Sequence, residues 1–168
     1  MVSMATGARP LPDGFVRLAA SMPLHNDAER VASLLDSGAL WADRLVAGVA
    51  ATGLRRYAVD LRLRVGREGP GLTTFSKAAY VDLGPTRRTA AGWEAEIGWQ
   101  ASTAAPLFPV FSGWLIISVE DLRVDGVYAP PGGVVGRVAN RVLLHIAANG
   151  TARWLLTEID RAALGAAA

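Results

Sequence analysis

The chain has 168 residues, of which 51% are hydrophobic and 19% are charged, with 17 Lys and Arg against 15 Asp and Glu. This length favours one domain with a full core, and the composition argues against long disordered stretches. The chain has no cysteine, which excludes disulfides and thiol chemistry and removes the usual soft ligands of zinc.

The chain begins with a polar segment and a short strand. We expect residues 1–14, which contain Pro10 and Pro12, to form a flexible leader. Phe15–Leu24 predicts a strand that Pro23 ends.

Two short helices are predicted next. Asn26 or Asp27 can cap the first helix, which Gly38 ends. A second helix is expected from Ala39 to about Gly53, because its apolar residues recur at helical spacing: Leu40, Trp41, Leu45, Val46 and Val49.

The middle of the chain changes to the two-residue period of strands. Tyr57–Val65 alternates apolar residues with Arg and Asp, and Gly66–Gly71 predicts a hairpin loop. Further strands are expected over Leu72–Leu83, Trp93–Gln100, Phe108–Val119 and Leu122–Tyr128. Since short turns join them, the sheet should be antiparallel.

The last part of the chain predicts one long helix. Pro130–Gly133 cannot continue a strand, and the helix should run from about Val134 to Leu164, before a disordered tail at 165–168. One side should carry Val135, Val138, Val142, Ile146, Gly150 and Trp154, and a polar stripe should carry Arg137, Arg141, His145, Asn149 and Arg153.

Three segments resemble a known family. Leu107–Leu115, Asp125–Arg137 and Leu143–Ala147 are similar to bacterial members of the START-like (SRPBCC) superfamily, the polyketide cyclase and lipid transport-like proteins. The resemblance covers about Trp99 to Ile159, with two departures: a very short turn at Glu120–Asp121, and Asn140 where an acid is usual.

This resemblance implies an α+β helix-grip fold. We therefore expect one domain over residues 15–164, in which a curved antiparallel sheet of about 6–7 strands wraps around the C-terminal helix, with two short helices after the first strand. Such proteins have a deep apolar cavity between sheet and helix, but the fold hosts many functions.

The expected function is the binding of a hydrophobic small molecule, lipid- or polyketide-like, in that cavity. Aromatic side chains with a polar tip suit such a pocket, although ordinary core packing explains the same residues. The predicted pocket residues are Trp93, Trp99, Phe111, Trp114, Leu115, Tyr128, Ile146 and Trp154.

No catalytic motif stands out, so a binding protein is favoured over an enzyme. The alternatives are a cyclase or aromatase that uses Tyr128, Lys77 or His145, and an interaction module without a ligand. Glu94 and Glu96 share a strand face and are expected to form surface ion pairs opposite Arg62 and Arg64. No metal or cofactor is expected, because the two histidines, His25 and His145, lie in no ligand cluster.

The expected partners follow from charge and hydropathy. The arginines are scattered among acids, which is atypical of nucleic-acid binding. No segment has the roughly 18 continuous apolar residues of a membrane helix, and no secretory signal begins the chain, so the cytoplasm is the default location. Apolar residues over Ala39–Val49 can support a homodimer or can equally cover the opening of the sheet. The sequence does not identify the ligand.

Overall fold

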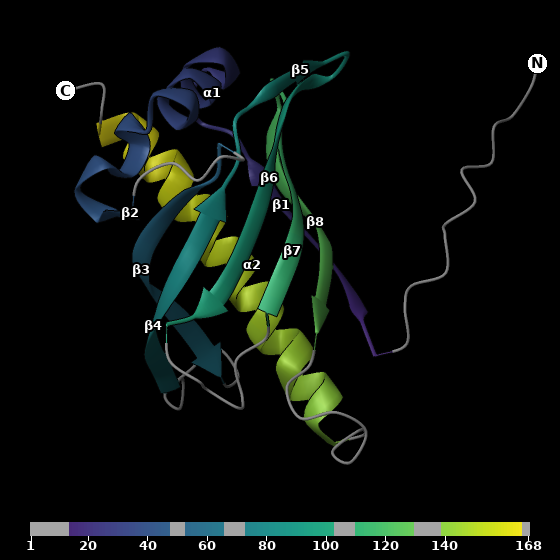
Figure 1. Ribbon diagram of the computed structural model, residues 1–168. Coiled ribbons are helices and arrows are strands. Elements are labelled where there is room, and N and C mark those ends of the chain that lie inside the picture. The colour runs from purple at the N-terminus through teal and green to yellow at the C-terminus, as the bar shows by residue number, and fades with distance from the viewer. Residues whose placement is uncertain (1–13, 48–52, 66–72, 103–109, 130–138, 166–168) are drawn as a thin grey trace, which may run out of the picture.

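The computed structural model describes residues 14–47, 53–65, 73–102, 110–129 and 139–165. Figure 1 shows one curved sheet, with the long helix α2 (Ala139–Gly165) across one face and α1 (Ala28–Ser37) beside the end of α2. The strands are β1 (Val16–Pro23), β2 (Leu45–Ala47), β3 (Arg55–Val65), β4 (Thr73–Leu83), β5 (Arg87–Thr89), β6 (Gly92–Ala101), β7 (Val110–Ile117) and β8 (Asp121–Ala129).

All strand pairs in the sheet are antiparallel. The order is β1-β8-β7-β6-β4-β3-β2, and β5 forms an extra hairpin with β6. This is the predicted helix-grip α+β architecture, which the structure confirms.

The sheet bends around α2. The backbone of α2 comes closest to β3 on one side and β1 on the other, and the central strands lie farther from it. Alternate residues of each central strand point into the space between the sheet and α2. The concave face of the sheet and α2 therefore form the two walls of the interior.

Helix α1 has well-defined ends. The side chain of Asp27 accepts a hydrogen bond from the backbone N–H of Arg30, and Gly38 ends the helix with a φ of 73°. Arg55 of β3 donates to the carbonyl oxygens of Leu35, at 2.8 Å, and of Asp36. The Leu35 oxygen also accepts from the backbone N–H of Gly38 at 3.1 Å. The helix is therefore fixed to the edge of the sheet at its last turn.

The cap at Asp27 should matter for stability. We expect Asp27→Ala to lower the free energy of unfolding by about 1 kcal/mol, because it leaves a helix-terminal N–H without an acceptor. Urea denaturation of the variant and the wild type measures this difference. An unchanged unfolding midpoint would show that water replaces the cap at no cost.

The predicted second helix is present but ends much earlier than expected. Residues Ala39–Arg44 form a 3₁₀ helix, η1, and the chain then turns into strand β2. Trp41 leaves helical geometry, with φ −139° and ψ 46°, and its ring packs edge-on against Tyr57 at 5.6 Å between centroids. This tertiary contact outweighs the helical spacing of the apolar residues. Residues 48–52 lie outside the described residues.

The inward face of α2 also differs from the predicted one. Its buried residues are Ala148, Thr151, Ala152, Leu155, Leu156, Ile159, Asp160 and Ala163. The prediction followed every fourth residue, but four residues overshoot one helical turn by about 40°, so such a line winds around the helix. The predicted start of the helix before Ala139, and the predicted loop at Gly66–Gly71, lie outside the described residues.

Candidate functional site

The eight predicted pocket residues fall in different places. Trp99, Phe111, Leu115 and Tyr128 are buried on the concave face of the sheet. Trp93 and Trp154 are partly buried and pack against the edge of the same core. These six residues therefore border the interior between sheet and helix.

The other two residues do not. Neighbouring residues of a strand point to opposite faces of the sheet. Trp114 directly precedes the inward residue Leu115 on β7, so its side chain points to the convex face. β7 is apolar on both faces, and its sequence therefore hides this alternation. Ile146 is 46% exposed on the outer side of α2, for the reason given above.

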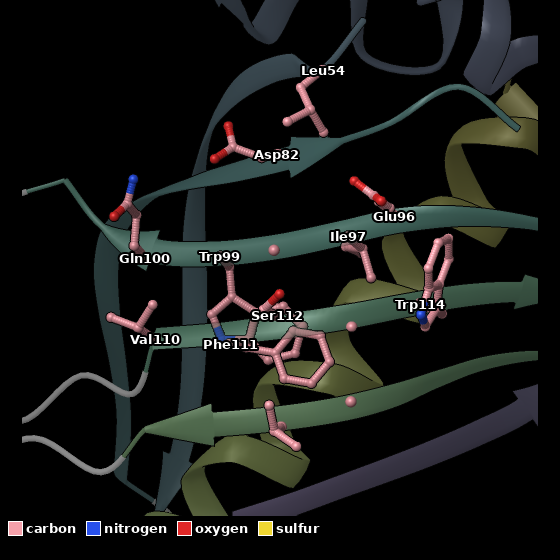
Figure 2. A pocket seen from close by; sticks show the side chains of 14 residues that line it. Leu54, Asp82, Glu96, Ile97, Trp99, Gln100, Val110, Phe111, Ser112 and Trp114 are labelled. Atoms are coloured by element: carbon pink, nitrogen blue, oxygen red, sulfur yellow. The ribbon is translucent and has the colours of Figure 1, made fainter. Parts of the chain in front are cut away.

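Trp114 instead borders a hollow on the convex face. Figure 2 shows this hollow from the side of the sheet opposite α2. It has a volume of about 560 Å³ and is lined by side chains of β4, β6, β7 and β8. The guanidinium of Arg87 lies over the Trp114 ring, 4.4 Å from its centroid.

In the interior, Trp99 and Phe111 form a stack. They are directly opposite each other on β6 and β7, with ring centroids 3.9 Å apart and planes 13° apart. The Phe111 ring covers the facing glycines Gly113 and Gly126, and a Cβ on either glycine would lie 2.8 or 2.7 Å from it. The two glycines thus make room for a flat aromatic layer on the sheet.

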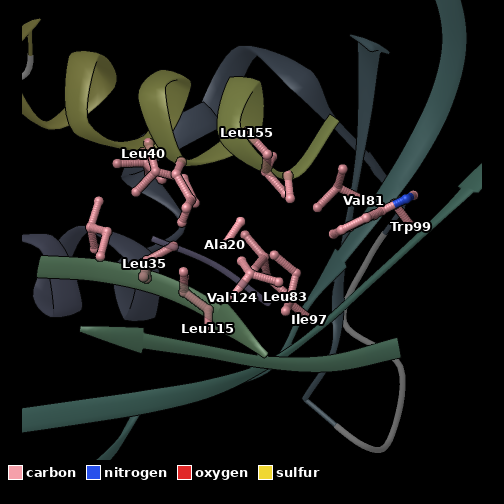
Figure 3. Close-up of a cluster of buried hydrophobic side chains, with 14 of the residues drawn as sticks. Ala20, Leu35, Leu40, Val81, Leu83, Ile97, Trp99, Leu115, Val124 and Leu155 are labelled. Carbon is pink, nitrogen blue, oxygen red and sulfur yellow. The ribbon is translucent and has the colours of Figure 1, made fainter. Parts of the chain in front are cut away.

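Two polar atoms in the interior have no hydrogen-bond partner. Among the described residues these buried atoms are Trp99 Nε1 and Thr151 Oγ1, on side chains that are 1% and 0% exposed. In Figure 3 the Trp99 nitrogen lies on the side of the indole away from the other labelled side chains. Buried polar groups are nearly always satisfied, so these two atoms are unusual polar positions in an otherwise apolar interior.

Thr151 is buried on the inward side of α2. It lies one turn before Leu155 on the same side of α2, and Figure 3 shows Leu155 close to Val81, which is paired with Trp99. The inward face of α2 is small at Ala148 and Ala152 and large from Leu155 onward. The helix therefore presents small side chains around Thr151 and large ones from Leu155 onward.

A second hollow, of about 670 Å³, is lined by both the sheet and α2. Trp154 forms part of its wall, with Val59 of β3 and Ala79 of β4. Its charged residues are Arg44, Asp60, Glu158 and Arg161, of which the last two form an ion pair. Through this hollow, the interface between the sheet and α2 is open to solvent, and its charged residues lie at the opening.

Sequence reasoning missed one polar cluster, at the junction of β1, α1 and α2. The side chain of Asp160 is 6% exposed and accepts from His25 Nδ1 at 2.8 Å, from the backbone N–H of His25 at 3.2 Å and from Asn26 Nδ2 at 2.8 Å. Burial acts to raise the pKa of Asp160, but the hydrogen bonds from Asn26 and His25 outweigh it, and the pKa is lowered. The sequence did contain one signal of this cluster, because Asp160 is an acid within the apolar stripe of α2.

The predicted chemical residues do not converge. His145 is exposed on α2, and the side chain of Lys77 lies outside the described ones. Glu94 forms its ion pair with Arg87 of β5, which corrects the expected pairing with Arg62 and Arg64, because β6 lies beside β4 and β5 and not beside β3. In the parts of the chain that the structure describes, no group of three or more His, Asp or Glu residues could hold a metal.

None of the helices in the described ranges combines the length and apolar character of a membrane span.

Comparison with known proteins supports the fold. No protein-family profile matches the chain, and no curated protein sequence matches it. The Zhui aromatase/cyclase from Streptomyces sp. R1128 is similar with a TM-score of 0.52 at 15% identity, over 92% of this chain and 96% of that one. This likeness confirms the predicted resemblance at the level of the fold.

Other solved structures are similar with lower TM-scores. TTHA0849 from Thermus thermophilus has a TM-score of 0.45 at 13% identity, over 91% of this chain and 100% of that one. The di-domain ARO/CYC BexL from the BE-7585A biosynthetic pathway has a TM-score of 0.44 at 16% identity, over 92% of this chain and 49% of that one.

Proposed function

We propose that the protein binds an apolar small molecule between the concave face of the sheet and α2, with the Trp99 indole N–H and the Thr151 hydroxyl as its polar contacts. The observation that carries this proposal is that both atoms are buried without a partner in an otherwise apolar layer. A buried unsatisfied donor costs about 1–3 kcal/mol. A ligand atom that accepts the hydrogen bond removes that cost.

The chemistry of the two groups restricts the ligand. An indole N–H can only donate, whereas a hydroxyl both donates and accepts. The ligand should therefore be largely apolar and carry a carbonyl or hydroxyl oxygen. Small-molecule sites commonly combine apolar walls with a few polar groups, and the fold shared with an aromatase/cyclase is consistent with an apolar ligand.

Thr151→Val tests this function. Valine has nearly the same shape without the hydroxyl, so we expect the free energy of unfolding of the ligand-free protein to rise by about 1 kcal/mol. The affinity for 1-naphthol should fall by about threefold to tenfold, the value of one hydrogen bond, while the affinity for naphthalene stays the same. Calorimetric titration and urea denaturation measure both effects.

The matched control is Thr157→Val, on the same helix. Thr157 is exposed and donates to the Arg153 carbonyl oxygen, outside the interior, and its replacement should leave both affinities unchanged. If the wild type binds neither probe, the interior holds no site and the protein is better explained as an interaction module.

The cyclase or aromatase alternative requires a reactive polar group at the bound substrate. Of its three candidates, Tyr128 is the one that the structure places in the interior, where it is 1% exposed. No observation assigns it a proton-transfer role, so binding is the function that the geometry supports best.

A further inference from the structure

Gly98 lies at the centre of four polar residues on the convex face of the sheet. Asp82 of β4 and Ser112 of β7 are directly opposite Gly98, and Glu96 and Gln100 are two residues away from it along β6. Because alternate residues of a strand share a face, all four side chains point away from α2. They surround the hollow shown in Figure 2, and its floor at Gly98 is bare backbone.

The ring of side chains carries one unbalanced negative charge. Arg56 neutralises Asp82 through two hydrogen bonds of 2.7 and 2.8 Å. Within the described residues, the side chains of Glu96, Gln100 and Ser112 have no hydrogen-bond or ion-pair partner. Each of them can accept a hydrogen bond, so three acceptors, one of which is the free carboxylate of Glu96, surround the same floor.

The hollow also has apolar walls. Val110, which is 51% exposed, and Val127 line it together with Trp114. The ring of Trp114 already contacts one cation, the guanidinium of Arg87. An aromatic face and a carboxylate together favour positively charged organic groups.

We propose that this hollow binds a small primary ammonium ion with a short apolar chain. The ammonium group can donate to the Glu96 carboxylate and to the Ser112 hydroxyl, which lie on neighbouring strands beside Gly98. The apolar chain lies along Val110 and Val127. This site is on the opposite face of the sheet from the interior and does not depend on the function proposed above.

Titration of n-butylammonium into ¹⁵N-labelled protein tests this site. The backbone amides of Gly98 and Ser112 should shift with a saturable dependence on concentration, and the affinity should fall as salt screens the charge. The neutral analogue n-butanol should leave both amides unshifted at the same concentrations. Equal shifts with n-butanol, or shifts that never involve Gly98, would overturn the proposal.

A charge-removing pair of variants sharpens the test. Glu96→Gln should lower the n-butylammonium affinity about fivefold, as expected for an exposed ion pair of about 1 kcal/mol. Glu120→Gln, in the exposed turn before β8, removes the same charge elsewhere and should leave the affinity unchanged. An equal loss in both variants would show a general charge effect and no site. Binding of 1-naphthol by Glu96→Gln should match the wild type, so the two proposals can fail separately.

Discussion

Replacing Gly113 with alanine should lower the free energy of unfolding by about 3 kcal/mol, near the upper end of the usual cost of overpacking. A Cβ at this position would lie 2.4 Å from the Asp125 carbonyl oxygen and 2.6 Å from the Cα of Gly126. Both atoms belong to the backbone of β8, which cannot withdraw without breaking its pairing with β7. The Phe111 ring, 2.8 Å from the same point, blocks the remaining direction. Urea denaturation followed by tryptophan fluorescence measures the loss.

Gly98→Ala is the control for this prediction. A Cβ at Gly98 would have the Phe111 carbonyl oxygen at 3.2 Å as its one near neighbour, and the cost should stay below about 1 kcal/mol. If both variants lose the same stability, the loss reflects glycine in a strand generally and not the close approach of β7 and β8.

Removing the Asp160 side chain should have the second large effect. We expect Asp160→Ala to lower the free energy of unfolding by about 3 kcal/mol. Hydrogen bonds to a charged group contribute about 1.5–3 kcal/mol each. The total loss is smaller than their sum, because His25 is exposed and can form hydrogen bonds with water instead. Asp160→Asn should lose less, since its amide oxygen can still accept from Asn26. Thermal and urea unfolding of the two variants provide the measurement.

The contribution of Asp160 should depend on pH. Its pKa is lower in the folded protein than its ordinary value, so the carboxylate stabilises the folded state above the unfolded pKa of about 3.9. That stabilisation is lost as the pH falls through the folded pKa. The difference between the wild type and Asp160→Asn should therefore be full at pH 7 and shrink below about pH 4. A difference that stays constant down to pH 3 would contradict this assignment.

The sequence predicted the long strands of the sheet, most clearly where apolar and polar residues alternate, but it did not predict the short strands β2 and β5. Apolar residues recur at every second position of β3 and β6, and those that the structure describes as buried include Tyr57, Val59, Ala95, Ile97 and Trp99. The segment after α1 was mispredicted because Leu40, Trp41 and Leu45 fit helical spacing, while the deciding contact of Trp41 with Tyr57 joins distant parts of the chain. The spacing of apolar residues within a segment carries no information about a contact with a distant part of the chain.

The candidate site was predicted in part. Trp99 and Phe111 were found because bulky aromatics in a predicted curved sheet are natural wall residues. Thr151 was missed, because a threonine on a helix gives no sign that its hydroxyl is buried and unpartnered. The hollow around Gly98 was also missed, since it depends on which residues of three strands face each other.

The order of strands has a consequence for how the molecule is made. β1 pairs with β8, and Val16 lies opposite Tyr128. The backbone of β1 therefore cannot form its sheet hydrogen bonds until β8 has been made. On a ribosome, the first strand would leave the exit tunnel long before its neighbour is translated. Folding dominated by such distant pairings is slow. We therefore expect completion of the sheet to be a late step that follows the translation of β8, with β1 exposed to chaperones until then.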